Sequence, residues 1–254
     1  MINQETVNKL IEMRLTTMAE EFKNQISRPS YHSLCFEERF GLLVDAEYTY
    51  RINNKLYRLI KKATLDQPHA SIEDINYKAG RKLNKSEILR LSTCDYIEGH
   101  HNIIILGATG AGKSYLSCAF GMEACKKYYA TKYIRLPELL MELNVALAEN
   151  TLKKLIQAYN SVRLLIIDDW MLSKLNESDA KLLLEIIHAR HKKASTIFCS
   201  QFDLKGWHQR ISEPTMADAI LDRIVYDSYV IEINSDSTSK DCSMREEYGI
   251  KRRK

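Results

Sequence analysis

One stretch in the middle of the chain restricts the possible fold more than any other. Residues 103–106 (IIIL) are apolar and mostly β-branched, which is typical of a buried strand. Residues 107–114 match G-x-x-x-x-G-K-[ST] at every fixed position, and a helical spacing without proline follows them. A strand, a glycine-rich loop and a helix form the context that phosphate binding at a helix N-terminus requires. The sequence therefore predicts a P-loop that binds a nucleoside triphosphate.

The residue types in this loop explain how it would bind phosphate. Glycines allow the backbone N–H groups to converge on the β-phosphate. The ammonium group of Lys113 supplies positive charge to the β- and γ-phosphates, and the hydroxyl of Ser114 ligates Mg²⁺. We therefore expect ATP and Mg²⁺ as cofactors. The residues expected to contact the nucleotide are Gly107, Ala108, Thr109, Gly110, Ala111, Gly112, Lys113, Ser114 and, directly after the loop, Tyr115.

A second motif ends in two acidic residues. Residues 164–167 (LLII) form an apolar run, and Asp168 and Asp169 follow it directly. This is the Walker B pattern, in which Asp168 holds Mg²⁺ directly or through water and Asp169 polarises the attacking water. Asp169 is one methylene shorter than the glutamate that most such ATPases carry at this position. We therefore expect ATP hydrolysis, catalysed slowly.

The composition narrows the class of protein. A chain of 254 residues that is 45% hydrophobic can bury a sizeable core, and it has no apolar run of the length, about 18 residues, that a membrane span needs. Residues 1–9 are polar and lack the apolar region of a signal peptide. The six cysteines include no C-x-x-C pair, so we expect reduced thiols rather than disulfides or zinc ligands. These features indicate a cytoplasmic protein without membrane contact.

The hydrophobic spacing predicts a helical region followed by an α/β domain. Residues 5–24 have the spacing of one amphipathic helix, and a longer helical pattern runs from Phe36 to Ile60. We therefore expect an all-helical N-terminal domain over residues 1–65 and an ATPase domain over 66–254. The first residues of the second range, 66–71, are the expected linker. In the ATPase domain, strand and helix patterns alternate, which predicts a parallel sheet with helices on both faces. The expected strands are 103–106, 132–135, 163–167, 196–199 and 229–233.

Basic residues are concentrated between Arg51 and Arg90. This segment has ten Lys and Arg residues against four Asp and Glu residues, with tyrosines between them. The pattern suits a surface that contacts DNA phosphates and stacks on bases, and it suits a solvated helix face equally well. The net charge of +4 permits a nucleic acid partner without requiring one.

Three further positions are candidates for contact with the γ-phosphate. Ser200 and Gln201 follow the expected strand at 196–199, and we choose Ser200 as the sensor, with a simple strand-end cap as the alternative. Arg223 lies in a helical segment and could act as an arginine finger, although its spacing also suits a surface salt bridge and Arg210 competes for the role. Arg245 is a weaker candidate for phosphate contact.

With these motifs, the sequence resembles the IstB-like helper ATPases of bacterial insertion sequences. These ATPases are relatives of the DnaC helicase loader within the AAA+ class. The resemblance covers nearly the whole chain. It is carried by the segments 95–98 (DYIE), 102–105 (NIII), 107–114 (GATGAGKS), 131–137 (TKYIRLP), 165–170 (LIIDDW), 200–201 (SQ), 207–208 (WH), 214–223 (PTMADAILDR) and 243–245 (SMR). Met171 departs from the family, because many relatives have glycine there.

The resemblance implies a P-loop AAA+ fold and a function in transposition. It implies a homo-oligomer that assembles with ATP on double-stranded DNA, largely without sequence specificity, and that selects and deforms the target. It also implies recruitment or stimulation of a transposase, with ATP hydrolysis, stimulated by DNA, driving release. By position, Ser200 would be the sensor and Arg223 the finger in trans. The basic residues expected to lie together against DNA are Lys126, Lys127, Lys132 and Arg135.

Three alternative functions share some of these sequence features. The alternative that shares most features is a DnaC-like replicative helicase loader, which has the same ATPase core and differs in its partner. A P-loop kinase would need an acceptor site and an arginine-bearing lid, and the sequence shows neither. A non-hydrolysing ATP-dependent adaptor is suggested only by Asp169 in place of glutamate.

Overall fold

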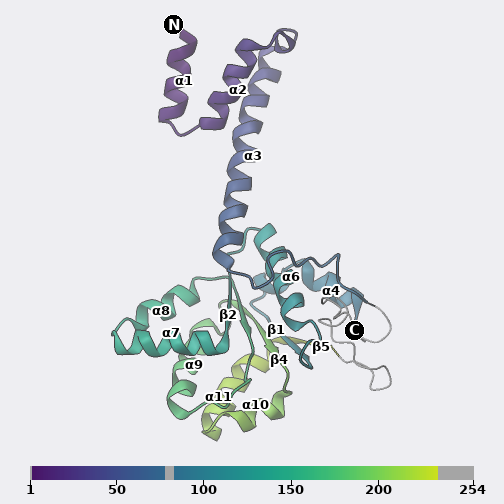
Figure 1. Ribbon diagram of the computed structural model, residues 1–254, viewed down its shortest axis with the longest axis vertical. Coiled ribbons are helices and arrows are strands. Elements are labelled where there is room, and N and C mark those ends of the chain that lie inside the picture. The colour runs from purple at the N-terminus through teal and green to yellow at the C-terminus, as the bar shows by residue number, and fades with distance from the viewer. Residues whose placement is uncertain (1, 78–82, 234–254) are drawn as a thin grey trace, which may run out of the picture. The chain divides into compact units, whose positions relative to one another are not determined.

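The computed structural model describes residues 2–77 and 83–233, and these divide into two compact units (Figure 1). The units are Met1–Arg58 and Leu59–Lys254, so the division falls inside a long helix. The helical region begins with α1 (Ile2–Glu12), α2 (Thr16–Ser27), the short 3-10 helix η1 (Pro29–Tyr31) and α3 (Phe36–Ala63). Within the described ranges, no helix has both the length and the apolar character needed to cross a membrane.

The first unit differs from the expected single helix over residues 5–24. The chain breaks after α1, where Arg14 has a left-handed backbone conformation with φ of 60°, and α2 then lies beside α1 (Figure 1). The N-terminus of α2 is capped from α3, because the backbone N–H groups of Thr17 and Met18 both donate to Glu47 Oε2 at 3.1 Å. The prediction of one helix was wrong because the residue that stabilises the break is distant in the sequence.

Glu47 is also linked, through Arg51, to the residue at which the chain breaks between α1 and α2. Its Oε1 accepts a hydrogen bond from Arg51 Nε at 2.7 Å, and Arg51 Nη2 donates to the carbonyl of Arg14 at 3.0 Å. Burial raises the pKa of the Glu47 carboxyl, but the hydrogen bonds from Arg51 and from the α2 amides outweigh that effect. The pKa therefore lies below its ordinary value of 4.5.

The second unit is built on a five-stranded parallel sheet of order β2-β3-β4-β1-β5. This confirms the predicted fold class and places each expected strand within a residue or two. The strands are β1 (Asn102–Gly107), β2 (Thr131–Arg135), β3 (Leu164–Asp168), β4 (Ser195–Ser200) and β5 (Ser228–Ile233). The helices are α4 (Lys85–Ser92), α5 (Asp95–Glu98), α6 (Lys113–Lys126), α7 (Leu136–Ala148), α8 (Leu152–Asn160), α9 (Glu177–Arg190), α10 (Leu204–Arg210) and α11 (Pro214–Val225).

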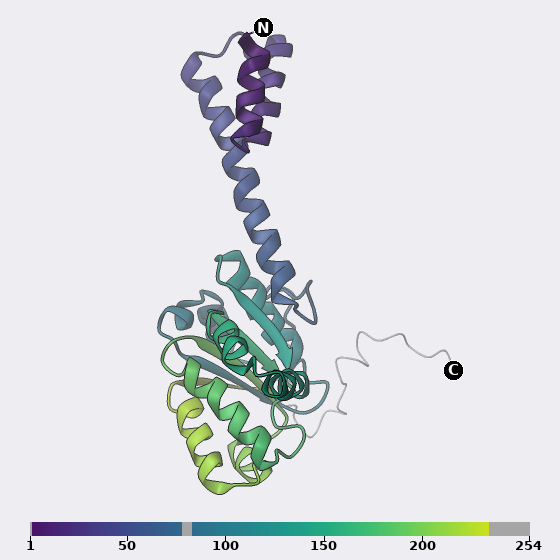
Figure 2. The same ribbon diagram turned by 90° about the vertical axis from the view of Figure 1, so that its left-hand side faces the viewer.

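Helices cover both faces of this sheet. Helix α6 packs against four of the strands on one face, while α7, α8 and α9 lie on the other (Figure 1). Helices α9 and α11 lie side by side (Figure 2). Gly121 of α6 packs closely against the sheet, because a Cβ there would lie 2.8 Å from Ile166 Cδ1 and 2.9 Å from Leu65 Cδ2, and these two side chains would have to shift.

The segment 66–71, expected as a linker, is part of the second unit. Leu65, Ala70 and Ile72 are buried, and the backbone N–H of Ser71 donates to Tyr115 Oη at 3.2 Å. The segment is therefore an irregular loop that packs against the second unit, and it is not a free linker. In the described part of the chain, the free cysteines are the exposed Cys35 and the buried Cys94, Cys118, Cys125 and Cys199.

Replacing Glu47 with alanine should loosen α2. The two α2 amides lose their acceptor, which typically costs about 1–2 kcal/mol. Because the folded pKa of Glu47 is lowered, its contribution is fully present above pH 4.5 and is lost as the pH falls through the folded pKa. Hydrogen–deuterium exchange of peptides from 16–27 measures both effects. Replacing the exposed Glu20 with alanine is the control, and equal exchange in the two variants would contradict the capping role.

Candidate nucleotide-binding site

The P-loop joins β1 to α6 at the carboxyl edge of the sheet. Gly110 and Gly112 have left-handed backbone conformations, with φ of 81° and 98°. These angles are readily adopted by glycine and strained for other residues. Gly107 is required for a different reason, because a Cβ there would lie 2.9 Å from the carbonyl oxygen of Ile233 in β5. The glycines of the motif thus shape a loop that opens at the N-terminus of α6.

Lys113 lies inside this loop and faces the end of β3. Its Nζ donates to the carbonyl oxygens of Gly107 and Ala108, both at 2.9 Å. Burial lowers the pKa of Lys113, and the carboxylates of Asp168 and Asp169 act in the opposite direction. Lys113 is therefore near enough to the two acidic residues to feel their charge, while its hydrogen bonds are to the P-loop backbone.

Asp168 is the last residue of β3, and its carboxylate is almost completely buried. Its Oδ2 accepts a hydrogen bond from Tyr133 Oη at 2.8 Å, and its Oδ1 accepts one from the backbone N–H of Asp169 at 2.8 Å. Burial and the neighbouring carboxylate raise the pKa of Tyr133, so its hydroxyl keeps its proton and remains a donor. The Asp168 carboxylate and the hydroxyl of Ser114, at the start of α6, are oxygen ligands of the kind that Mg²⁺ prefers. Mg²⁺ is bound through one or two carboxylates, waters and phosphates.

Asp169 points toward β2 and pairs with Arg135. Both Nε and Nη2 of Arg135 lie 2.8 Å from Asp169 Oδ2. The hydrogen bond and the charge of Asp169 raise the pKa of Arg135. Asp169 itself has a left-handed backbone conformation, with φ of 52°. The expectation that Arg135 lies with the other basic residues against DNA did not include this contact.

The turn after Asp169 is anchored in the core. Trp170 is fully buried, and its ring lies edge-on to Phe198 and Trp207, with centroids 4.6 Å and 5.6 Å away. Met171 follows with φ of 56° and a fully buried side chain. This left-handed conformation favours glycine, which is the residue that the resemblance leads us to expect at this position.

Ser200 and Gln201 have different environments. Ser200 is buried; its Oγ donates to the carbonyl of Trp170 at 2.9 Å and accepts hydrogen bonds from Trp207 Nε1 at 2.9 Å and the N–H of Phe202 at 3.1 Å. Gln201 is exposed, and its Oε1 accepts a hydrogen bond from Thr109 Oγ1 of the P-loop at 2.7 Å. The geometry therefore favours Gln201 over Ser200 as the phosphate sensor.

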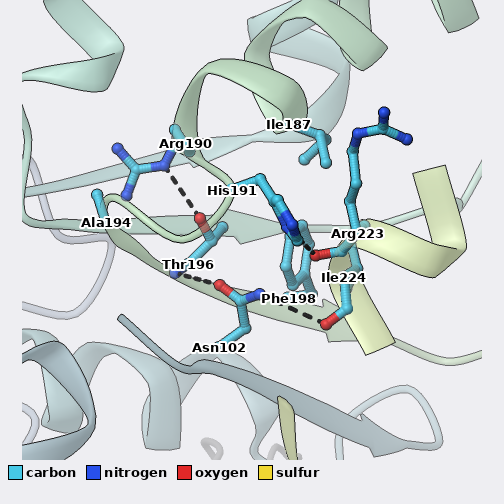
Figure 3. Close-up of a pocket in the computed structure, with 9 residues that line it drawn as sticks. All are labelled: Asn102, Ile187, Arg190, His191, Ala194, Thr196, Phe198, Arg223 and Ile224. Atoms are coloured by element: carbon cyan, nitrogen blue, oxygen red, sulfur yellow. Dashed lines mark hydrogen bonds between the residues drawn. The ribbon is translucent and has the colours of Figure 1, made fainter. Parts of the chain in front are cut away.

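Arg223 lies at the opposite edge of the sheet. It lines a small pocket with residues from the starts of β1 and β4, and its side chain extends away from Asn102 and Thr196 (Figure 3). Its Nη1 donates to the carbonyl of Ala219 at 2.8 Å, and its own carbonyl bonds to His191 Nδ1 at 3.1 Å. The six residues of β1 separate the two edges by about 17 Å. Arg223 is therefore not brought to the P-loop of its own chain.

The remaining candidates are divided among several places. The hydroxyl of Tyr115, expected to contact the nucleotide, donates to the carbonyl of Ser71 at 3.4 Å. Arg210 lies over the ring of Phe202, 3.6 Å from its centroid, and Arg245 lies outside the described residues. None of these three is placed beside Lys113 by a described contact.

The expected grouping of basic residues was wrong. Lys126 ends α6 and Lys127 follows it at the amino edge of the sheet, whereas Arg135 ends β2 at the carboxyl edge beside Asp169. The reason is topological, because β2 runs from one edge to the other and Lys132 lies along it. The sequence places these residues close together along the chain but not on one surface.

Comparison with protein families and curated proteins identifies relatives over nearly the whole chain. A family model described as IstB-like ATP binding protein matches residues 8–245. A putative insertion sequence ATP-binding protein of Sinorhizobium fredii is 38% identical over 237 residues, which cover 93% of this chain and 96% of the relative. The putative ATP-binding protein of insertion sequence IS1162 from Pseudomonas fluorescens is 39% identical over 201 residues, covering 79% and 87%.

Two solved structures with a similar fold are those of DnaI and of the DnaC helicase loader. The crystal structure of DnaI has a TM-score of 0.57 at 22% identity and covers 70% of this chain and 94% of its own. The crystal structure of the DnaC helicase loader has a TM-score of 0.55 at 17% identity and covers 65% and 97%. At these identities the likeness establishes the fold, which is of the AAA+ P-loop type.

Replacing Ser200 with alanine should lower the stability of the protein, whereas replacing Gln201 should lower the rate of ATP hydrolysis. Ser200→Ala removes the acceptor of the Phe202 N–H and one of the two acceptors of Trp207 Nε1, which keeps the carbonyl of Phe202 at 2.8 Å, so the free energy of unfolding should fall by about 1 kcal/mol. Gln201→Ala should leave stability within about 0.5 kcal/mol and slow ATP hydrolysis. Urea denaturation and a phosphate-release assay measure the two effects, with the exposed Ser173→Ala as control. A Ser200→Ala variant as stable as the control would contradict the structural role of this hydroxyl.

Proposed function

Because the chain belongs to the family of IstB-like ATP binding proteins, we propose that it is an ATP-dependent helper of transposition. In this role it assembles on target DNA, deforms it and recruits or stimulates a transposase, and ATP hydrolysis drives release. The observation that carries the proposal is a P-loop that holds Lys113, with the buried Asp168 at the end of β3, in a chain whose residues 8–245 match the family model. The names of the curated relatives, which belong to insertion sequences, support the biological context.

The site residues divide the chemistry between them. Lys113 exchanges its hydrogen bonds to the carbonyls of the P-loop for bonds to phosphate oxygens. Ser114 and Asp168 hold Mg²⁺, which neutralises charge on the phosphates when bound. Asp169 accepts a hydrogen bond from the attacking water and polarises it, and Gln201 responds to the γ-phosphate through its contact with Thr109.

The position of Arg223 supports assembly. An arginine finger at the amino edge cannot reach a nucleotide at the carboxyl edge of the same sheet, so Arg223 completes the site of a neighbouring subunit. A triphosphate between Lys113 of one subunit and Arg223 of the next stabilises the contact by opposite charge. Hydrolysis removes the γ-phosphate and weakens that contact, so the oligomer loosens on DNA.

A DnaC-like helicase loader is the second candidate function. The observation in its favour is the likeness of the fold to the DnaC helicase loader. Both functions use the same ATPase site, and they differ in the protein that is recruited. A pull-down with an insertion-sequence transposase, compared with a replicative helicase from the same cell, separates the two.

Large particles should form only when DNA and a triphosphate are both present. Light scattering measures this on random-sequence duplex DNA with ATP, a non-hydrolysable analogue or ADP. We expect assembly with ATP and the analogue, none with ADP, and none for Lys113→Ala, because that variant lacks the charge that binds the phosphates. Binding should weaken steeply with salt, because phosphate contacts release counterions. A protein that stays monomeric under every condition would contradict the mechanism in trans.

A further inference from the structure

Tyr133, in the middle of β2, donates a hydrogen bond to the acid that is expected to hold Mg²⁺. Its Oη lies 2.8 Å from Asp168 Oδ2, and both residues are buried. In the parallel pairing of β2 with β3, Tyr133 lies beside Ile166, which shares a face of its strand with Asp168. The two side chains therefore meet on one face of the sheet, although no sequence motif marks the tyrosine.

The Asp168 carboxylate is held at both of its oxygen atoms. Oδ2 accepts the hydrogen bond from Tyr133, and Oδ1 accepts one from the backbone N–H of Asp169 at 2.8 Å. Hydrogen bonds to an ionised carboxylate are about twice as strong as those between neutral groups. The donor to Oδ2 is a side chain, so a single substitution can remove it without changing the backbone of the turn.

Tyr133 is itself held in place and keeps its proton. Its ring is buried, and its backbone carbonyl accepts a hydrogen bond from Thr64 Oγ1 at 3.2 Å. Burial and the charge of Asp168 raise the pKa of Tyr133, so the phenol remains a donor. The hydrogen bond to Asp168 is therefore in place before a nucleotide or a metal ion arrives.

Lys113 offers a competing partner for a carboxylate that is free to turn. The charge of Asp168 acts on Lys113, whose pKa it raises against the effect of burial. The Nζ of Lys113 nevertheless donates to the carbonyl oxygens of Gly107 and Ala108. If the carboxylate turned to this ammonium group, both groups would be withdrawn from the metal ion and the phosphates. The hydrogen bond from Tyr133 opposes that rotation.

We infer that Tyr133 is a positioning residue that holds the Asp168 carboxylate in the orientation in which it receives Mg²⁺. This inference rests on the nucleotide site of the proposed function and does not depend on DNA or on a transposase. Mg²⁺ demands nearly ideal octahedral geometry, so its affinity is sensitive to how a ligand is oriented. Removing an outer partner of a metal ligand typically lowers metal affinity about 10–100-fold.

The variant Tyr133→Phe removes the hydroxyl and keeps the ring that packs in the core. The Mg²⁺ concentration that gives half of the gain in affinity for a fluorescent ATP analogue should rise about tenfold. The affinity measured in EDTA should be unchanged, because the hydroxyl acts through Asp168 and the metal ion. Fluorescence titrations with the analogue over a range of Mg²⁺ concentrations measure both quantities.

Tyr159→Phe is the matched control. The hydroxyl of Tyr159 also donates to a carboxylate, that of Glu142 at 2.6 Å, but Glu142 lies on α7, outside the predicted magnesium site. This variant should keep the Mg²⁺ dependence of the wild type. In the double variant Tyr133→Phe, Asp168→Asn, the loss should equal that of Asp168→Asn alone, because the effect passes through Asp168. A thermal melt confirms that each variant is folded.

The inference is overturned if Tyr133→Phe keeps the Mg²⁺ dependence of the wild type, or if Tyr159→Phe shows the same loss. It is also overturned if the double variant loses more than Asp168→Asn does. A wild type that binds the analogue equally well with and without Mg²⁺ overturns the magnesium site of the proposed function, and the inference with it. The two failures can be told apart, because only the second is seen in the wild type.

Discussion

The site depends on how the turn after β3 separates two adjacent carboxylates. Asp169 has a left-handed backbone conformation, and the two carboxylates have separate partners on β2, which are Tyr133 Oη for Asp168 and the guanidinium of Arg135 for Asp169. Because each carboxylate has its own hydrogen-bond donor, the two can take different roles.

The turn after β3 is held in place by packing against the core and by hydrogen bonds to β4. Trp170 is buried between Phe198 and Trp207, and its backbone N–H donates to the carbonyl of Cys199 at 2.8 Å. The Ser200 hydroxyl completes the link by bonding to both tryptophan residues. Hydrophobic packing on one face of the sheet thus sets the geometry of the acidic residues at its edge.

Features that depend on neighbours along the chain were predictable from the sequence. The P-loop, the five strands and the acidic pair follow from local spacing, and the structure contains all of them. Features that depend on distant partners were not. The break between α1 and α2 needs Glu47, the role of Ser200 needs Trp207, and the pairing of Arg135 with Asp169 needs the adjacency of β2 and β3.

The most direct test of this account is to separate nucleotide binding from hydrolysis in Asp168→Asn and Asp169→Asn. Fluorescent ATP titrations with and without Mg²⁺ measure binding, and single-turnover assays measure hydrolysis. The account predicts that Asp169→Asn binds MgATP as the wild type does but no longer hydrolyses it, whereas Asp168→Asn loses the gain in affinity that Mg²⁺ provides. Hydrolysis at the wild-type rate by Asp169→Asn would contradict the division of roles between the two carboxylates.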